Sequence, residues 1–305
     1  MTRTMTNERI AALGYDYGAQ AAYRPAACNL CGVRGGAVEV ADQDRYGYPA
    51  TFVVCQRCGL GYLCPQLNAS QYAHFYSEIY RPLVSAYHGR RIDAETVQLD
   101  QRGYATGLAT FLLPLLTSSP RTILDVGGST GVVSRVLAAR PHARVTVLDP
   151  SPDELAVARA AGMETVAGLV EDFDPGGRRW DLVLLCQTID HLLDVRGTLT
   201  ALRRMMASGG RAFVDIVDVD VLLHRTGSIE RVVKIDHPYY LTRPAAVALF
   251  TLAGFTIVAE RLTDDGHRGF VLAPGAGSEP DWPALEATAA QFLSSISTLR
   301  AGEFG

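Results

Sequence analysis

A glycine-containing loop, Asp125-Val-Gly127-Gly128-Ser129-Thr130-Gly131, holds the residues best placed for chemistry. The apolar run before Asp125 has strand character, and the apolar residues after Gly131 repeat with the spacing of one helical face. A strand, a tight loop and a helix in this order place free backbone N–H groups and a helix N-terminus beside the strand's end. The loop is therefore typical of a nucleotide site.

The loop does not fit two common nucleotide motifs. No register of it has glycine at the first, third and sixth positions of a dinucleotide fingerprint, and no Lys-Ser or Lys-Thr pair closes it as in a P-loop. Asp125 adds a further objection, because a carboxylate beside a pyrophosphate would be repelled. A cationic ligand without phosphate suits the loop better.

A second group with chemical potential is the pair of C-x-x-C-G knuckles at Cys28, Cys31, Cys55 and Cys58, with 23 residues between the two knuckles. Two knuckles at this separation can present four thiolates to one tetrahedral ion, which predicts a structural zinc site in a small ribbon. Iron in a rubredoxin-like site would use the same thiolates, although nothing calls for electron transfer. A pair of disulfides is the competing interpretation, and an expected reducing cytoplasm argues against it.

Composition limits the protein classes. The chain has 305 residues, a net charge of −4 and 48% hydrophobic residues, which favours a globular protein without strong attraction to nucleic acid or acidic membranes. The ribbon region is itself close to neutral, which disfavours nucleic acid as a partner. The N-terminus lacks an apolar signal core, and the longest apolar stretch is too short to cross a bilayer, so a cytoplasmic protein with a small-molecule substrate is expected.

The elements that position these residues alternate between strands and helices from residue 121 onward. Strands are predicted at 122–126, 144–148, 164–167, 181–186, 211–217, 255–260 and 270–273, with helices between several of them and a last helix at 282–299. This order predicts an α/β protein with a parallel, doubly wound sheet and a ligand at the strands' carboxyl ends. The predicted divisions are an N-terminal extension (1–25), the zinc ribbon (26–70), a helical linker or lid (71–120), the sheet domain (121–275) and a C-terminal helix (276–305). Cys64 and Cys186 lie outside the knuckles and are expected to be small core residues.

The loop resembles the acidic-x-Gly-x-Gly-x-Gly loop of class I S-adenosylmethionine (SAM) methyltransferases, with Ser129 in place of the middle glycine. SAM carries an ammonium and a sulfonium and no phosphate, which agrees with Asp125. The resemblance implies a class I methyltransferase, Rossmann-like fold and implies that Asp125, Gly127, Gly128, Ser129 and Gly131 hold the methionine part of SAM.

Further cofactor residues follow from position within the class I pattern. Asp149, 24 residues after Asp125, would accept from both ribose hydroxyls, and Pro150 would lie against the adenine. Glu171 or Asp172 would accept from the adenine amino group. Gln187 would approach the methionine end.

Over most of its length the chain resembles the zinc-ribbon methyltransferases of deoxysugar and natural-product biosynthesis, whose best-known branch is the sugar C-methyltransferases. The matching stretch is Asp236-His-Pro-Tyr-Tyr240 before the sixth helix. The resemblance implies that His237 is the catalytic base, beside Asp236, with Lys234 where the family has tyrosine. Lys234 would hold a phosphate or stabilise an enolate, and His191, in an Asp-His pair after the fourth strand, is a further catalytic candidate. The family's large C-terminal domain has no counterpart here.

Substrate residues are expected in two places. Tyr76, Tyr80 and Arg81 follow the ribbon in an aromatic stretch whose helical spacing suits either packing of the ribbon or the mouth of the cofactor site. Tyr240 belongs to the matching stretch, and His267 loosely echoes a His-Gly-Gly-Ser stretch of the family.

The leading interpretation is thus a zinc-containing, SAM-dependent enzyme that methylates an oxygen or a carbon of a small polar metabolite, a sugar or a nucleotide-linked sugar. A catalytically idle SAM-fold protein that binds a partner through its ribbon is the alternative.

Overall fold

The computed structural model describes residues 3–138 and 143–302. The helices are α1 (Arg3–Ala11), α2 (Tyr17–Gln20), α3 (Ala69–His74), α4 (Tyr80–His88), α5 (Ala94–Leu112), α6 (Val132–Leu137), α7 (Pro152–Ala160), α8 (Val195–Arg204), α9 (Val219–Thr226), α10 (Arg243–Leu252) and α11 (Trp282–Gly302). Short helical turns are η1 (Phe75–Ile79), η2 (Leu113–Leu115), η3 (Val170–Asp172) and η4 (Ile189–His191). The strands are β1 (Ala37–Gln43), β2 (Pro49–Cys55), β3 (Gly61–Leu63), β4 (Thr122–Val126), β5 (Arg144–Asp149), β6 (Glu164–Ala167), β7 (Trp180–Leu185), β8 (Met206–Val217), β9 (Tyr239–Tyr240), β10 (Phe255–Leu262) and β11 (His267–Pro274).

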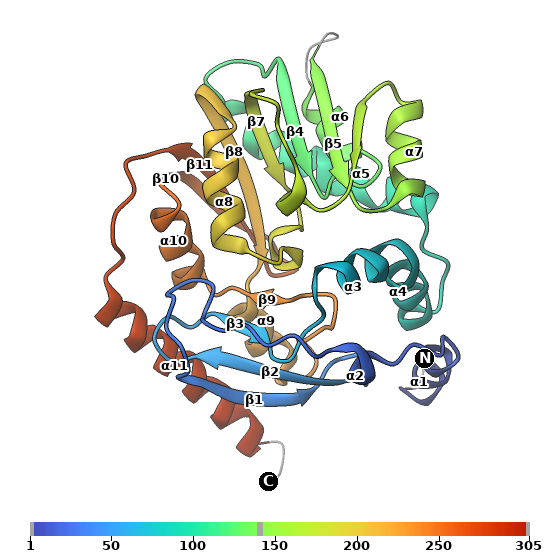
Figure 1. The fold of residues 1–305 in the computed structure, drawn as a ribbon, viewed down its shortest axis with the longest axis vertical. Helices are drawn as coiled ribbons and strands as arrows, with labels where there is room; N and C mark the ends of the chain where they lie inside the picture. Colours follow the sequence, from blue (N-terminus) through green and yellow to red (C-terminus); the bar gives the residue numbers. More distant parts are fainter. Residues whose placement is uncertain (1–2, 139–142, 303–305) are drawn as a thin grey trace.

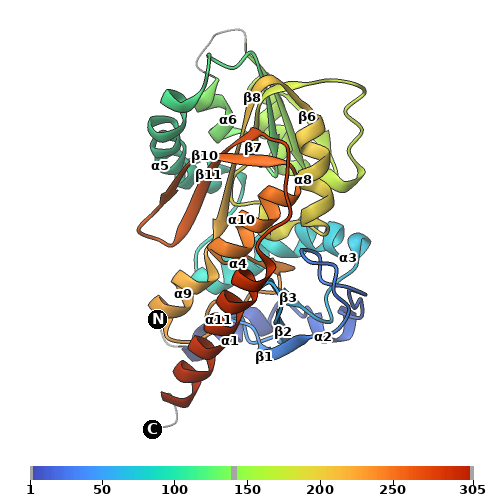
Figure 2. The ribbon, with the colours of Figure 1, turned by 90° about the vertical axis from the view of Figure 1, so that its left-hand side faces the viewer.

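The larger sheet has seven strands in the order β10-β11-β8-β7-β4-β5-β6. Strands β8, β7, β4, β5 and β6 pair in parallel, and the order runs outward from β4 in both directions, which confirms the predicted doubly wound α/β fold. Helices α5 and α6 cover one face of this sheet, and α8 and α10 cover the other (Figure 2).

One strand differs from the expected parallel arrangement. Strand β11 pairs antiparallel with both β10 and β8. Only residues 263–266 separate β10 from β11. A connection of this length allows a hairpin and is too short for the crossover that parallel neighbours require.

The smaller sheet is antiparallel, in the order β1-β2-β3-β9, and lies below the larger one in Figure 1. Its last strand, β9, comes from the insertion between β8 and α10, so residues close to the predicted catalytic stretch complete the sheet that carries the second knuckle. The predicted division between residues 26–70 and 121–275 stays a prediction. The hydrogen-bonded sheet crosses it.

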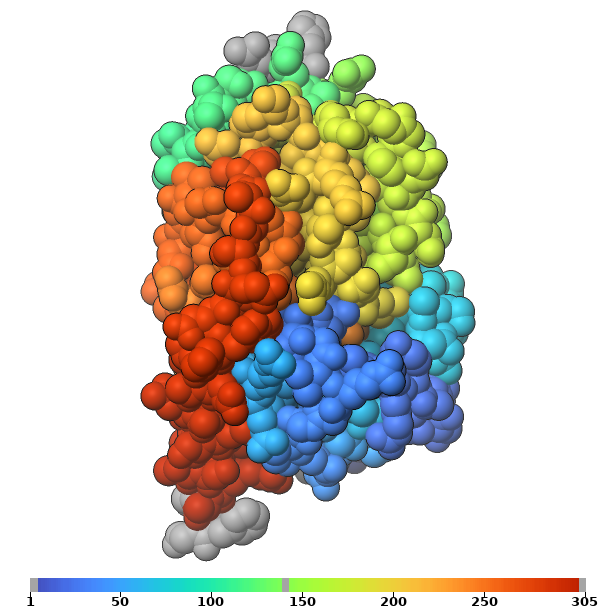
Figure 3. Space-filling view, turned by 60° about the vertical axis from the view of Figure 1, so that its left-hand side comes forward, coloured from blue at the N-terminus to red at the C-terminus, as the bar shows by residue number. Residues whose placement is uncertain are grey.

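Apolar packing joins the two sheets. Leu30 and Leu60 of the knuckles belong to the same buried cluster as Leu192, Leu199 and Leu249 around the larger sheet. Helix α11 packs Leu285 into this cluster and Phe292 and Ile296 into the core of the smaller sheet. In Figure 3 this C-terminal helix (red) runs beside the blue residues of the smaller sheet, so residues far apart in sequence share one surface.

The N-terminal segment is more ordered than expected. The sequence predicted only an extension at residues 1–25, whereas α1 spans Arg3–Ala11 and α2 follows it. Tyr17 is buried against the smaller sheet's core, and the side chain of Asp16 accepts from Ala19 N at 3.0 Å to cap α2. Burial of Tyr17 therefore anchors a segment whose local sequence signal is weak.

Candidate active site

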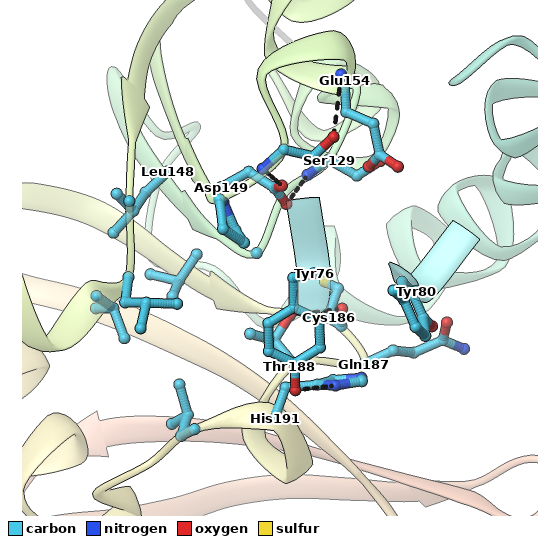
Figure 4. A pocket seen from close by; sticks show the side chains of 18 of the residues that line it. Tyr76, Tyr80, Ser129, Leu148, Asp149, Glu154, Cys186, Gln187, Thr188 and His191 are labelled. Atoms are coloured by element: carbon cyan, nitrogen blue, oxygen red, sulfur yellow. Dashed lines mark hydrogen bonds between the residues drawn. The ribbon is translucent and has the colours of Figure 1, made fainter. Parts of the chain in front are cut away.

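A cleft lies at the carboxyl ends of the parallel strands, where the direction of the strand order changes. Its walls come from η1 and α4, the loop after β4, the β5–α7 junction, the β6–η3 segment and the β7–η4 segment (Figure 4). The space between these walls is about 940 Å³, including solvent at the mouth. A cleft at this position in a doubly wound sheet is where such folds bind nucleotide ligands.

Asp149 is held at the centre of one wall by two backbone donors. Ser129 N donates to Asp149 Oδ2 at 2.9 Å, and Ser151 N donates to Oδ1 at 2.8 Å. Ser129 adopts φ 53° and Gly127 φ 65°, conformations that turn the loop after β4 towards β5. Burial, followed by the charge of Glu154, raises the pKa of Asp149 to about 7.

An ion pair bridges the cleft mouth. Arg81 Nε of α4 lies 2.5 Å from Glu154 Oε1 of α7, and the glutamate side chain is 4% exposed. Among the cleft-lining residues that the structure describes, Arg81 is the only Arg or Lys, and this carboxylate pairs it. The cleft therefore offers carboxylates to a cation and to hydroxyl groups, and no unpaired guanidinium or ammonium to a phosphate.

Three of the predicted loop residues stand behind the lining. Asp125 is fully buried, which raises its pKa to about 6. A Cβ at Gly128 would lie 2.5 Å from Asp125 Cγ, and one at Gly131 would lie 2.4 Å from Met163 Cε. Gly128 and Gly131 thus permit close packing of the loop, whereas Gly127 and Ser129 line the cleft.

The opposite end of the cleft is formed after β7. Gln187 lines it with φ 53°, and its N–H donates to Asp215 Oδ1 at 2.5 Å. Asp215 Oδ2 in turn accepts from Tyr104 Oη at 2.6 Å, so α5 and β8 together fix the Gln187 backbone. Cys186, expected in the core, is half-buried and lines the cleft as well, because β7 ends one residue before it.

His191 lies on the cleft wall, and its protonation follows from its partners. Its Nδ1 is 2.9 Å from the Asp236 carbonyl oxygen and 3.1 Å from Tyr76 Oη. Since a carbonyl only accepts, Nδ1 carries the proton and Nε2 keeps its lone pair. Burial lowers the pKa of His191 to about 4, so the ring is neutral near pH 7.

Behind His191 lies a buried group made of Lys234, Asp236 and His237. The His191 and His237 ring centroids are 4.5 Å apart. His237 Nε2 lies 3.4 Å from Asp236 Oδ2 and 3.0 Å from Lys234 Nζ. Burial lowers the pKa of Lys234 to about 8 and lowers that of His237 well below its usual value, with the Lys234 charge as the next cause for His237. The structure thus brings the four predicted catalytic residues together, with His191 facing the cleft and His237 one ring deeper.

The family of this chain follows from its similarity to a known domain. A family model described as a methyltransferase domain matches residues 94–260, more than half of the chain. The chain belongs to this methyltransferase family. Its cleft lies at the carboxyl ends of the parallel strands.

Individual relatives resemble part of the methyltransferase. A ubiquinone biosynthesis O-methyltransferase of Methylobacterium sp. is 33% identical over 105 residues, 32% of this chain and 41% of the relative. An uncharacterized methyltransferase of Mycobacterium bovis is 34% identical over 99 residues, 32% of this chain and 40% of the relative. The chain therefore spans about two fifths of the length of these curated relatives.

Solved structures share the fold. A putative O-methyltransferase from Nostoc punctiforme has a TM-score of 0.50 at 20% identity and covers 66% of either chain. Magnesium protoporphyrin IX methyltransferase from Synechocystis, with bound S-adenosylhomocysteine (SAH), has a TM-score of 0.50 at 12% identity and covers 68% of this chain and 99% of its own.

The cleft of the methyltransferase fits SAM by its donor set. Asp149 keeps lone pairs for hydroxyl groups, and the paired state of Arg81 leaves the cleft without a free phosphate-binding cation. Pro150, Gln187 and Glu171 line the cleft with the predicted aromatic residues Tyr76 and Tyr80 and with Arg81. Glu171 Oε1 already accepts from Leu193 N at 2.7 Å, which leaves Oε2 for a ligand.

Three further predicted residues lie away from the cleft lining. Asp172 is exposed in η3, and His267 Nδ1 pairs with Asp265 at 3.1 Å. Tyr240 is fully buried, where its hydroxyl accepts from Lys234 N and donates to Lys234 O, so it fixes the backbone of Lys234. Their predicted roles stay predictions.

Sequence reasoning missed several lining residues, among them Gln101, Thr188 and Leu192. Ser151 and Glu154 had a usable signal, because they follow Asp149 directly and form the cap of α7. Gln101 had no such signal in the sequence, because it belongs to α5, which precedes the first strand of the larger sheet.

The four knuckle cysteines converge as predicted. One sulfur from each residue lies within 4.8 Å of the others, with Cys28 and Cys58 sulfurs 3.5 Å apart and those of Cys31 and Cys55 3.7 Å apart. Four thiolates at about 2.3 Å from one zinc ion would be separated by roughly such distances, and a disulfide requires about 2 Å. The residues therefore fit a zinc ion, which would hold the two knuckles together.

Among the helices in the described ranges, none is both long and apolar enough to span a membrane.

Proposed function

We propose that the protein transfers the methyl group of SAM to an oxygen or a carbon of a small polar metabolite, specifically a sugar or a nucleotide-linked sugar, with His237 as the general base. The observation that carries this proposal is the buried group of His191, Lys234, Asp236 and His237 directly behind the cleft wall. Titratable groups gathered in this way beside a cofactor cleft are characteristic of proton-transfer sites.

The chemistry requires such a base. The sulfonium of SAM is already a good electrophile, so the protein has to align the acceptor and remove a proton near neutral pH. The acceptor's oxygen or carbon would take the methyl group, SAH would leave, and the proton would pass to His237 Nε2. Asp236 Oδ2, 3.4 Å from that nitrogen, would stabilise the imidazolium formed.

Lys234 controls whether His237 can accept the proton. Its Nζ lies 3.0 Å from His237 Nε2 and so occupies the lone pair that the reaction needs. An anionic group of the substrate, such as a phosphate, would attract Lys234 and free this lone pair. Base activation would then follow from substrate binding.

A polar acceptor is supported by buried polar atoms without a hydrogen-bond partner among the described residues. Four of these atoms belong to residues around Lys234, namely Asp190 Oδ1, Asp236 Oδ1, His237 Nδ1 and Arg45 Nε. The charge of Lys234 lowers the pKa of Asp190, and the charges of Asp236 and Arg45 in turn shift the pKa of Lys234. These groups therefore lie in one region. A ligand rich in hydroxyl groups supplies donors and acceptors to such atoms.

The test is incubation of the purified protein with SAM and a panel of free sugars, nucleotide-linked sugars and phenols. We expect SAH, together with a sugar product heavier by one methylene. His237→Ala should keep SAM affinity by calorimetry and lose about 10²- to 10⁴-fold in turnover. His224→Ala is the matched control, because His224 is also a histidine beside an aspartate, Asp220, and is exposed on α9.

Two results would contradict the proposal. Methylation of phenols alone would remove the sugar assignment. A loss of SAM affinity in His237→Ala would place this residue in cofactor binding and out of the base role.

A further inference from the structure

The first cysteine knuckle touches the segment that forms the cleft wall. Asn29, between Cys28 and Cys31, donates from Nδ2 to Asp194 Oδ1 at 2.9 Å, and its Oδ1 accepts from Arg196 N at 3.1 Å. Leu30 O, the next residue's carbonyl, accepts from Arg196 Nη1 at 3.3 Å. The knuckle is thus bonded to the N-terminus of α8 across more than 160 residues of sequence.

The segment at this helix start borders the SAM cleft. His191 and Leu192 line the cleft, and Leu193 and Asp194 follow them. Glu171 Oε1, from the facing cleft wall, accepts from Leu193 N at 2.7 Å and from Asp194 N at 3.3 Å. The segment 191–194 is therefore held between Glu171 on the cleft side and Asn29 on the ribbon side.

Asp194 connects the two contacts. Its Oδ1 accepts from Gly197 N at 2.9 Å as the N-cap of α8, and the same oxygen accepts from Asn29. A change at Asn29 therefore changes the cap of α8 and the backbone of the residues that precede it. In Figure 3 the blue region that contains the knuckles abuts the yellow region around α8, which agrees with these bonds.

The second knuckle offers an internal comparison. Gln56 holds the position in Cys55-Gln-Arg-Cys58 that Asn29 holds in the first knuckle, and it is exposed to solvent. Arg57, the next residue, lies over the Trp282 ring of α11 at 4.7 Å. The two knuckles can share one zinc ion, yet the first alone reaches the segment beside the cleft through its Asn29 bonds.

We propose that Asn29 is a positioning residue for SAM binding, which couples the metal-held knuckle to the segment 191–194, whose first two residues line the cleft. With zinc bound, the four thiolates fix the knuckle turn, Asn29 fixes Asp194, and the wall is held in its binding geometry. Without this link the wall samples other positions, and SAM affinity falls by the fraction of molecules in the competent geometry. The proposal concerns the methyl donor and is independent of the acceptor's identity.

The test is a donor–acceptor swap, with each variant prepared with one zinc per chain. Asn29→Asp keeps the acceptor for Arg196 N but sets two carboxylates against each other, so we expect the SAM Kd from calorimetry to rise about fivefold or more, as for the loss of roughly one net hydrogen bond. Adding Asp194→Asn removes the contact between the carboxylates and supplies an amide donor to position 29, while the amide oxygen, turned towards Gly197 N, takes over the cap that Asp194 Oδ1 provides. The double variant should return to within about twofold of the wild-type Kd.

Gln56→Asp is the matched control, with the same change at the equivalent position of the other knuckle and an unchanged SAM Kd expected. Melting temperature and zinc content are followed in parallel, because a purely structural role would alter them and leave the Kd alone. The proposal is overturned if Asn29→Asp binds SAM like the wild type, if Gln56→Asp weakens SAM equally, or if the double variant shows no recovery.

Discussion

Binding of SAM should depend on pH through Asp149. In the SAM-free protein, burial and the charge of Glu154 raise the pKa of Asp149 to about 7. If the two ribose hydroxyls of SAM donate to this carboxylate, the bound protein keeps it ionised at lower pH, because hydrogen bonds to the charged form favour that form. SAM binding would then release a proton below about pH 7, and affinity would increase with pH.

The size of the effect follows from the fraction of Asp149 that is ionised before binding. For a pKa of about 7, this fraction is about one tenth at pH 6 and about nine tenths at pH 8. The SAM Kd should therefore be about tenfold larger at pH 6 than at pH 8. Asp125, with its pKa raised to about 6, contributes mainly below this window.

Isothermal titration calorimetry checks this directly. Titrations at pH 6, 7 and 8, in pairs of buffers with different ionisation enthalpies, give both the Kd and the number of protons released. Asp149→Asn is the control, because an amide has no proton to lose. The variant should bind SAM more weakly and lose the tenfold dependence, with no more than the about twofold change between pH 6 and 8 that Asp125 contributes.

A flat wild-type profile, or the same slope in Asp149→Asn, would refute the assignment of Asp149 to the ribose hydroxyls. The stability of the SAM-free protein should change in the opposite direction. A carboxyl whose pKa is raised on folding binds more protons when folded, so its contribution to the free energy of unfolding falls as the pH rises from about 4 to about 7.

Three further predictions concern packing, charge and metal. Gly128→Ala would place a Cβ 2.5 Å from Asp125 Cγ and should weaken SAM binding more than tenfold by calorimetry. Gly103→Ala in α5 is the control, because the space around its Cβ is open, and it should leave the SAM Kd unchanged. Equal effects of the two variants would contradict the packing role of Gly128. Glu154→Gln should lower the free energy of unfolding in urea by about 2 kcal/mol, because it leaves Arg81, which is 27% exposed, without its carboxylate partner. Asp100→Asn is the control, because it breaks an ion pair whose partners are both 52% exposed and should cost about 0–0.5 kcal/mol. An equal loss of stability in the two variants would contradict a stabilising role of the Arg81–Glu154 pair. Cys58→Ser should lose zinc, measured per chain by emission spectroscopy, and should melt at a lower temperature. Cys64→Ser, which lies outside the four-cysteine group, should retain the metal. Full zinc content in Cys58→Ser would contradict a four-thiolate site.

Local sequence signals predicted the parts of the cleft that depend on chain order. Asp149 was placed from its distance after Asp125, because consecutive parallel strands bring their carboxyl ends to one edge of the sheet. The same rule placed Gln187 at the end of β7 and predicted the α/β fold. The knuckle spacing predicted the convergence of the cysteines, since each knuckle is a local turn.

Contacts between distant segments could not be predicted in this way. Tyr76 meets His191 across 115 residues, and His191 meets the Asp236 carbonyl across 45. Strand β9 has two residues, too few to show a periodic pattern. It pairs with β3, although most strands of the larger sheet lie between the two in the sequence. The antiparallel direction of β11 depends on its hairpin connection, which strand periodicity does not report.

Equilibrium binding of unmodified cofactors tests the central claim most directly. The account predicts that the purified protein binds one SAM per chain, that SAH competes for the same site, and that nicotinamide dinucleotide and ATP do not bind. Uptake of either phosphate-bearing nucleotide in this cleft, with no binding of SAM, would contradict a site built from Asp149 and an Arg81 held in an ion pair with Glu154.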